Sequence, residues 1–239
     1  MKKIVEIFVS VRIWFTGILF LVLGSASMLM VGIFHRGNFL DRVLKFWCRL
    51  IVRTSSIRVT IKGLENIEPG KQYVVMMNHV NMFDGVLIVG SIPMKVRGIE
   101  EESHFKWPVY GWLIRGLGNV PINRKSGRRA LESLRKAGDY MRRHEDLSVI
   151  IFPEGTRTRN GKLQKIKKGG FLLAVEAGLE ILPVVQVGSY AIKKKVHWLI
   201  RPGHVELVFE KPIPTADLGR EAIPGLIETV TGVFRKHVD

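Results

Sequence analysis

The amino-acid sequence predicts an α/β fold, with a mixed, largely parallel sheet flanked by helices and preceded by an N-terminal membrane-embedded two-helix segment. Two observations support this fold class. From residue 55 onward, short apolar runs typical of buried strands alternate with longer helical stretches. Before that point the chain has a long uncharged run and then a basic amphipathic stretch. We therefore expect membrane-anchoring helices over residues 1–54 and an α/β domain over residues 55–239.

The composition favours anionic partners and a reducing compartment. The 239 residues include 37 Lys and Arg against 21 Asp and Glu, which gives a formal charge of +16 at pH 7. This charge favours nucleic acid, anionic lipid or a phosphorylated substrate, and by itself does not choose among them. Cys48 is the single cysteine, so an intramolecular disulfide is excluded. We expect no nucleic-acid partner, because the sequence shows neither a known nucleic-acid module nor exposed aromatics interleaved with the basic residues.

Two helices are expected at the N-terminus. Residues 13–34 hold no charged side chain, and a helix of this length is roughly 33 Å long against a hydrocarbon core of ~30 Å. Residues 38–53 repeat apolar side chains at helical spacing and place basic ones on another face, so we expect this helix among the lipid headgroups. Basic residues flank the first helix on both sides and leave its orientation open. It either crosses the bilayer or forms a re-entrant hairpin, and a cleaved signal peptide is the remaining alternative.

The α/β domain is expected to alternate strands and helices between Gly and Pro breakers. The predicted strands are 57–62, 73–77, 95–99, a short strand after the turn at Gly118, 147–152, 181–185 and 204–209. The predicted helices are one that begins at Asp84 and four over 107–117, 126–144, 169–178 and 223–236. Trp107, Tyr110 and Trp112 recur near helical spacing, and we expect them in the core rather than against lipid.

The stretch from Met76 to Gly85 is the main candidate for chemistry, because it places His79 and Asp84 five residues apart in a strand-to-helix loop. An imidazole accepts and returns a proton near neutral pH, and a carboxylate on its other nitrogen fixes the tautomer and stabilises the imidazolium. From these residues alone, two alternatives stay open. The pair is a surface polar pair in which Asp84 caps the next helix, or it belongs to a metal site, although the other histidines and Cys48 show no ligand spacing around it.

Two further stretches follow predicted strands. Arg124 comes just past the short strand after Gly118, and residues 152–157, Phe-Pro-Glu-Gly-Thr-Arg, come at the end of the strand 147–152. Ligands of open α/β sheets bind beyond the carboxyl ends of the strands. We therefore expect both stretches to meet His79 at one edge of the sheet.

The residue types in these stretches suit an anionic substrate. A guanidinium group, as in Arg124 or Arg157, grips phosphate oxygens in a bidentate way. Gly155 allows backbone amides to approach an anion, and Glu154 either accepts a hydrogen bond from a hydroxyl or holds Arg157. Two basic tracts follow in the sequence; they consist of Arg157, Arg159, Lys162, Lys165, Lys167 and Lys168, and then of Lys193, Lys194 and Lys195.

The sequence resembles the glycerolipid acyltransferase family, and most closely its bacterial 1-acylglycerol-3-phosphate acyltransferases. The resemblance covers roughly residues 55–215 and rests on four blocks in the family's order. Asn78-His79 with Asp84 resembles the Asn-His-x4-Asp block, and residues 118–124 resemble the Gly-x5-Arg block. Residues 152–157 match the Phe-Pro-Glu-Gly-Thr-Arg block, and Leu182-Pro183-Val184 resembles the fourth, an apolar-Pro-apolar strand. Four blocks at family-like spacing are a specific signal, unlike a lone short motif.

The resemblance implies a reaction and a set of site residues. An acyl chain would pass from a thioester, acyl-coenzyme A or acyl carrier protein, to the sn-2 hydroxyl of lysophosphatidic acid, giving phosphatidic acid without cofactor or metal. His79 would act as the general base and Asp84 would orient it. The expected substrate-binding residues are Lys106, Arg124, Glu154, Gly155, Thr156 and Arg157. The protein would act at an anionic membrane surface, namely the inner cell membrane, with its catalytic domain facing the cytoplasm.

One position departs from the family. Many members carry a lysine shortly before the helix that leads to the second block, and counting back from Pro108 and Gly111 this position is Glu102. Either Lys106, one helical turn later, replaces that lysine, or the acceptor differs from lysophosphatidic acid. The alternatives are therefore the same reaction on another acceptor, such as glycerol 3-phosphate or another lysolipid, and a catalytically idle protein that binds anionic membranes.

Overall fold

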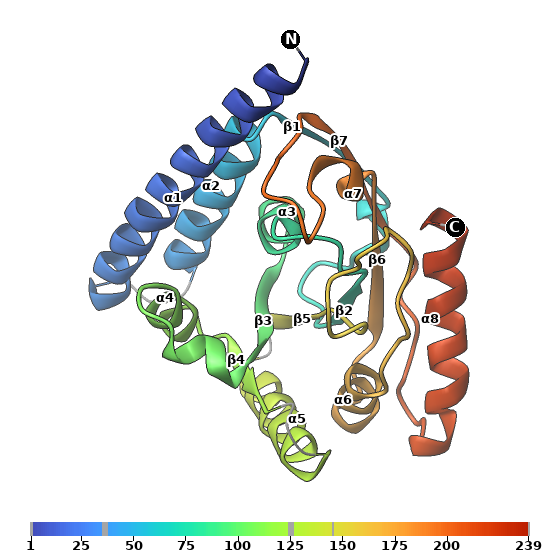
Figure 1. The fold of residues 1–239 in the computed structure, drawn as a ribbon. Helices are drawn as coiled ribbons and strands as arrows, with labels where there is room; N and C mark the ends of the chain where they lie inside the picture. Colours follow the sequence, from blue (N-terminus) through green and yellow to red (C-terminus); the bar gives the residue numbers. More distant parts are fainter. Residues whose placement is uncertain (1, 35–37, 124–126, 145, 239) are drawn as a thin grey trace.

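The computed structural model of the chain describes residues 2–34, 38–123, 127–144 and 146–238. Two helices, α1 (Lys2–Phe34) and α2 (Asn38–Thr54), lie side by side at one flank of an α/β domain whose sheet has helices on both faces (Figure 1). The predicted fold class is confirmed. The boundary between residues 54 and 55 stays a prediction, because both helices make extensive contacts with the α/β domain.

Within the described residues the sheet has seven strands in the order β1-β7-β6-β2-β5-β3-β4. The strands are β1 (Ile57–Lys62), β2 (Val74–Met77), β3 (Lys95–Glu101), β4 (Val120–Ile122), β5 (Leu147–Ile151), β6 (Ile181–Val187) and β7 (Gly203–Phe209). Neighbouring strands are parallel, except that β6 and β7 are antiparallel. The strands from β6 to β4 in this order therefore end at the same side of the sheet, which we call the carboxyl edge.

Strand β2 lies in the middle of the sheet and is buried on both faces. Successive side chains of a strand point to opposite faces. Val75 and Met77 accordingly pack in the core that includes helix α3 (Asp84–Ser91), whereas Val74 and Met76 pack in the core on the other face. All of these side chains have an exposed fraction of 0%. The residues that follow β2 at the carboxyl edge are therefore anchored by the most buried strand.

Three helices of the α/β domain follow the predicted ranges closely. Helices α5 (Gly127–Arg142), α6 (Gly169–Ala177) and α8 (Ile223–Val238) cover the face opposite α3 (Figure 1), and Gly178, with φ of 66°, ends α6 in the left-handed conformation that favours glycine. Helix α7 (Ser189–Ile192) follows β6. Short 3₁₀ turns cover Leu64–Asn66, Glu102–Lys106 and Arg220–Ala222.

The prediction for residues 107–117 is partly wrong. Helix α4 covers Tyr110–Gly116 only, because Val109, with φ of 61°, breaks the backbone before it. Trp107 and Trp112 are 54% and 56% exposed rather than part of the core. Leu113 of α4 and Leu117 just after it pack against α1 and α2, so Trp112 of α4 faces outward.

The prediction for the first helix is wrong at its start, because α1 begins at Lys2 rather than at residue 13. A charged side chain ends an apolar run without ending a helix, and the polar side chains of this additional part bind the α/β domain. Ser10 Oγ accepts a hydrogen bond from Ile200 N at 2.9 Å, and Arg12 Nη2 donates to Ser56 Oγ at 2.8 Å. Helix α1 is therefore attached to the domain along its N-terminal third.

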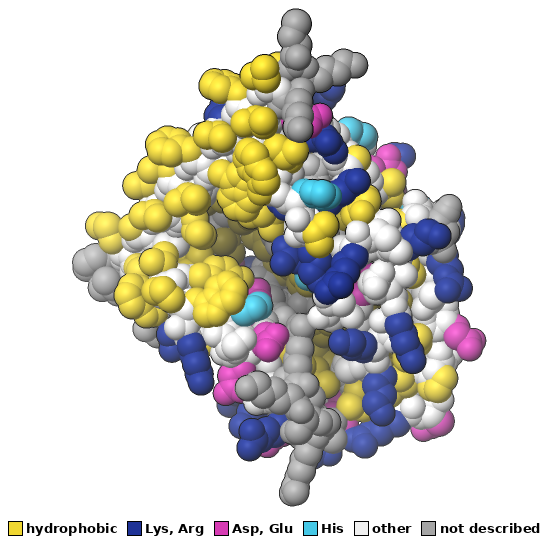
Figure 2. Space-filling model, in the orientation of Figure 1, with side chains coloured by type: hydrophobic (Ala, Val, Ile, Leu, Met, Phe, Trp, Pro, Cys, Tyr) yellow, Lys and Arg dark blue, Asp and Glu magenta, His cyan; other side chains and the backbone are white. Residues whose placement is uncertain are grey.

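Helices α1 and α2 form an antiparallel hairpin. Arg12 near the start of α1 binds the end of α2, and Trp47 Nε1 donates to Ser27 Oγ at 2.8 Å farther along. Among the described residues one segment, Ile4–Gly32 of α1, is long and apolar enough to cross a membrane. Figure 2 shows apolar side chains over the outer surface of α1 and α4. The two helices are confirmed, and their position in a bilayer is taken up below.

Candidate active site

His79 and Asp84 form a hydrogen-bonded pair at the carboxyl edge. His79 follows β2, Asp84 is the first residue of α3, and His79 Nδ1 lies 2.7 Å from Asp84 Oδ2. The Asp84 side chain is 1% exposed. It also accepts hydrogen bonds from Val80 N at 2.7 Å and Asn81 N at 3.0 Å, so the turn between strand and helix holds the carboxylate in place.

The remaining ring nitrogen of His79 is available to a substrate. The ring stacks on Phe152 with centroids 4.2 Å apart, and 23% of the His79 side chain is exposed. Because Asp84 accepts from Nδ1–H, the neutral ring has an unprotonated Nε2. No hydrogen bond reaches Nε2 from any residue in the described part of the chain. The pair can therefore take a proton from a bound molecule.

Glu154 holds the His79 backbone instead of facing solvent. Glu154 is 2% exposed. Its Oε1 accepts a hydrogen bond from His79 N at 2.5 Å, and its Oε2 accepts one from Gln164 N at 2.7 Å. Burial raises the pKa of the Glu154 carboxyl, and the two backbone N–H groups act in the opposite direction. The described residues show no ion pair between Glu154 and Arg157, which was one of the expected arrangements.

The block 152–157 lies directly against the His79 loop. Gly155, with φ of 69°, forms a tight turn in which its N–H donates to Phe152 O at 2.9 Å. Thr158 N, just beyond the block, donates to His79 O at 2.9 Å. Arg157 is half-buried in the same loop. The convergence of these two stretches, expected from the sequence, therefore takes place.

Two asparagine side chains whose role sequence reasoning missed hold the His79 loop to β6 and α7. Asn78 Oδ1 accepts Gln186 N at 2.8 Å, and Asn78 Nδ2 donates to Gln186 O at 3.1 Å. Asn81 Nδ2 donates to Ser189 Oγ at 2.7 Å. One signal was available, because Gln186 is the single polar side chain of the otherwise apolar strand β6, and its Nε2 donates to Asn78 O at 3.0 Å.

Lys106 lies at the same edge, beside a polar cavity. This cavity of about 310 Å³ is formed where β3 and β4 end and is lined by Lys106, Glu102, Asn123 and Arg129, among others. Glu102 accepts a hydrogen bond from Asn123 Nδ2 at 2.7 Å. Arg124, the other expected phosphate ligand, lies outside the described residues.

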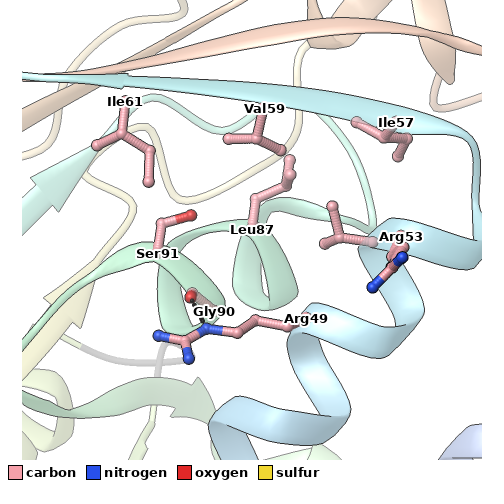
Figure 3. Close-up of a pocket in the computed structure, with 9 residues that line it drawn as sticks. Arg49, Arg53, Ile57, Val59, Ile61, Leu87, Gly90 and Ser91 are labelled. Carbon is pink, nitrogen blue, oxygen red and sulfur yellow. Dashed lines mark hydrogen bonds between the residues drawn. The ribbon is translucent and has the colours of Figure 1, made fainter.

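A second cavity lies away from this site. It has a volume of about 290 Å³ between β1, α2 and the end of α3, and Ile57, Val59 and Leu87 line it together with Arg49 and Arg53 (Figure 3). Arg49 Nε donates to Gly90 O at 2.8 Å, which satisfies a carbonyl at the C-terminal end of α3. In the described part of the chain, no three His, Cys, Asp or Glu side chains gather as a metal ion would require.

Comparisons of the sequence with protein families and with individual proteins all find acyltransferases. Residues 58–187 match the acyltransferase family model. The chain is 31% identical to a 1-acyl-sn-glycerol-3-phosphate acyltransferase of Pseudomonas aeruginosa, over 80% of this chain and 77% of the relative. It is 33% identical to the human 1-acyl-sn-glycerol-3-phosphate acyltransferase beta, over 75% of this chain and 64% of that protein.

A solved structure extends the similarity to the N-terminal helices. The crystal structure of the 1-acyl-sn-glycerophosphate acyltransferase PlsC from Thermotoga maritima matches with a TM-score of 0.84 and 26% identity. This match covers 99% of the present chain and 95% of that one, so it includes α1 and α2. Together with the family model, which covers more than half of the sequence, these similarities show that the chain belongs to the acyltransferase family.

Proposed function

We propose that the protein is a 1-acylglycerol-3-phosphate O-acyltransferase, which transfers an acyl chain from an acyl thioester to the sn-2 hydroxyl of lysophosphatidic acid and forms phosphatidic acid. The observation that carries this proposal is the His79–Asp84 pair, 2.7 Å apart, with Nε2 of His79 open to a substrate, in a member of the acyltransferase family. Relatives named for this activity support the choice of acceptor.

In the proposed reaction His79 acts as the general base. Its Nε2 takes the proton of the acceptor hydroxyl while that oxygen attacks the thioester carbonyl carbon. When the tetrahedral intermediate collapses, the carbon–sulfur bond breaks, and the imidazolium returns the proton to the leaving thiolate. Asp84 stabilises the transient positive charge on the ring and keeps Nδ1 protonated. The hydroxyl attacks the thioester directly, so an acyl-enzyme is not required.

The acceptor phosphate is assigned to basic side chains at the carboxyl edge. Arg157 lies in the loop attached to His79, and Lys106 lines the polar cavity beyond β3 and β4. Arg124 is added to these phosphate-binding side chains on the evidence of the sequence motif alone. Thr156, exposed beside Arg157, offers a hydroxyl to the same anion, whereas Glu154 and Gly155 shape the loop that carries these groups. Charge-assisted hydrogen bonds of this kind are the stronger ones in proteins.

We also propose that the helical hairpin enters the cytoplasmic leaflet of the inner membrane without crossing it. The exposed apolar side chains of α1 require a nonpolar environment, and those near its end, such as Met30, lie far from the polar contacts of Ser10 and Arg12 with the α/β domain. A helix attached to the catalytic domain along its N-terminal third, and running beside α2, places both helices on the side where the domain lies. The acceptor and the product then reach the site from the bilayer.

Labelling of single cysteines tests this arrangement. In a Cys48→Ser background, Asn38→Cys reports on the start of α2, and Lys211→Cys is the matched control on the α/β domain. We expect a membrane-impermeant maleimide to label neither variant in intact cells and to label the control once the cells are opened. Labelling of the Asn38→Cys variant in intact cells would show that the hairpin crosses the membrane.

The proposed activity is tested by identifying the lipid product. Purified protein is incubated with palmitoyl-coenzyme A or palmitoyl acyl carrier protein and with lysophosphatidic acid, glycerol 3-phosphate or a lysolipid that carries an amine, and products are identified by mass spectrometry. We expect phosphatidic acid as the main product. A preference for the amine-bearing lysolipid would change the acceptor and would give Glu102 a direct role, and no product from any acceptor would contradict the proposal.

A further inference from the structure

The segment that follows β6 is joined to the loop that follows β5. Tyr190 Oη donates to Arg159 O at 2.8 Å, and Lys195 Nζ donates to Thr156 Oγ1 at 2.9 Å. Lys194 Nζ lies 5.4 Å from the centroid of the Tyr190 ring. These contacts gather the side chains of Arg159, Lys194 and Lys195, which we call the basic rim. Figure 2 shows basic side chains grouped beside a hollow that the apolar surface of α1 and α4 borders on its other side.

The basic rim has no counter-charge within the described part of the chain. Among the described residues, none of its three side chains forms an ion pair, whereas Lys71 pairs with Glu180 and Lys62 with Glu206 elsewhere on the surface. Partial burial, and then the nearby guanidinium groups of Arg159 and Arg157, lower the pKa of Lys195. Like charges held together in this way repel one another and favour the binding of an anion.

A buried lysine fixes the orientation of the basic rim. Lys193 is 7% exposed, and its Nζ donates to Lys194 O at 2.9 Å and also to His197 O. The loop thus formed turns Lys195 toward Thr156, while the neighbouring Val196 is 68% exposed. A lysine that bound lipid headgroups would extend outward, as the neighbouring Val196 does. Lys195 instead points to the loop whose Thr158 N binds His79 O.

We propose that the basic rim binds the phosphate of the phosphopantetheine arm of the acyl donor. This inference rests on the proposed function, in which the reaction brings two phosphate-bearing molecules to one site. The acceptor phosphate is assigned to Arg157 and to the β3 and β4 side. In the donor, the phosphate is separated from the thioester by the pantetheine chain, so its site belongs at a rim near His79 and not beside the ring. Coenzyme A and acyl carrier protein share this phosphate.

Donor kinetics with and without that phosphate test the proposal. The double variant Lys194→Gln/Lys195→Gln is compared with Lys165→Gln/Lys168→Gln, which removes the same charge from exposed lysines of the neighbouring tract. We expect KM for palmitoyl-coenzyme A and for palmitoyl acyl carrier protein to rise about 10-fold in the rim variant only, with kcat and the acceptor KM unchanged. With palmitoyl-pantetheine, which lacks the phosphate, both variants should match the wild type.

Each other outcome would overturn the proposal in a recognisable way. A rise confined to the acceptor KM would assign the basic rim to the acceptor, and an equal loss with palmitoyl-pantetheine would mean that the lysines only support the loop. Weaker co-sedimentation with anionic vesicles at unchanged donor KM would assign the rim to the bilayer. Unchanged kinetics throughout would exclude any binding role.

A direct titration separates this inference from the proposed function. Free coenzyme A is titrated into the detergent-solubilised His79→Ala variant with the basic rim intact, and then with Lys194→Gln/Lys195→Gln added. Loss of coenzyme A binding when Lys194→Gln/Lys195→Gln is added would support the donor-binding role of the basic rim, even if no acyl transfer were found. Acyl transfer by the wild type together with equal binding by both variants would contradict the inference alone.

Discussion

Replacement of His79 by alanine is expected to lower kcat by on the order of 10²–10⁴-fold, because the variant loses the group that takes the proton of the acceptor hydroxyl. The KM for the acceptor should change little, since the phosphate-binding side chains remain. The Asp84 carboxylate keeps its hydrogen bonds from Val80 N and Asn81 N, so the turn should stay folded. Steady-state kinetics with palmitoyl-coenzyme A and lysophosphatidic acid measure the effect.

A matched control removes a histidine elsewhere. His144 is exposed beyond the end of α5, where its ring nitrogen Nδ1 bonds to Tyr140 O, and the variant His144→Ala should keep the wild-type kcat. Thermal unfolding of both variants shows whether the fold is intact. A folded His79→Ala variant with kcat within a few-fold of the wild type would mean that another group is the base.

Replacement of Asp84 by asparagine is expected to lower kcat by up to about 10⁴-fold. The aspartate accepts hydrogen bonds from His79 Nδ1, Val80 N and Asn81 N, and an asparagine of the same shape has one acceptor oxygen and one donor nitrogen. Its amide group must therefore face a backbone N–H or force His79 into the other tautomer. In either case the imidazolium loses the negative charge that stabilises it.

The same change also tests whether Asp84 only caps α3. The buried mismatch should cost about 1–3 kcal/mol of unfolding free energy, which urea denaturation measures. Asp139→Asn, at an exposed aspartate paired with Arg142, is the control and should change neither kcat nor stability appreciably. Loss of stability with wild-type kcat in the Asp84→Asn variant would leave Asp84 as a helix cap with no part in the reaction.

Much of the α/β domain could be predicted from the sequence because local patterns and global fold agree there. The apolar run that begins at Leu147 has the length and the flanking breakers of a strand buried on both faces, and the structure places β5 at Leu147–Ile151. His79, Asp84 and the block 152–157 were expected to meet, since each follows a strand and parallel strands end at one edge. The pairing of β2 with β5 brings them together.

The remaining features depend on tertiary contacts that a local pattern does not contain. Helical spacing groups Trp107 and Trp112 with apolar neighbours but does not specify what covers each face. The structure instead buries Leu113 of α4 and Leu117 just after it. Hydropathy placed the start of α1 after Arg12, because the side chains that bind the α/β domain are polar. The contact of Lys195 with Thr156 joins segments 39 residues apart, which no local pattern shows.

The measurement that tests the central claim most directly is the stoichiometry of thiol and product. Purified protein is mixed with palmitoyl-coenzyme A, with and without lysophosphatidic acid, and free thiol and phosphatidic acid are quantified in the same samples. We predict one thiol for each phosphatidic acid and no thiol release, not even a burst, without acceptor, with both products lost in the His79→Ala variant. Thiol release without acceptor would contradict direct transfer to the hydroxyl, and release that persists in His79→Ala would place the catalytic base elsewhere.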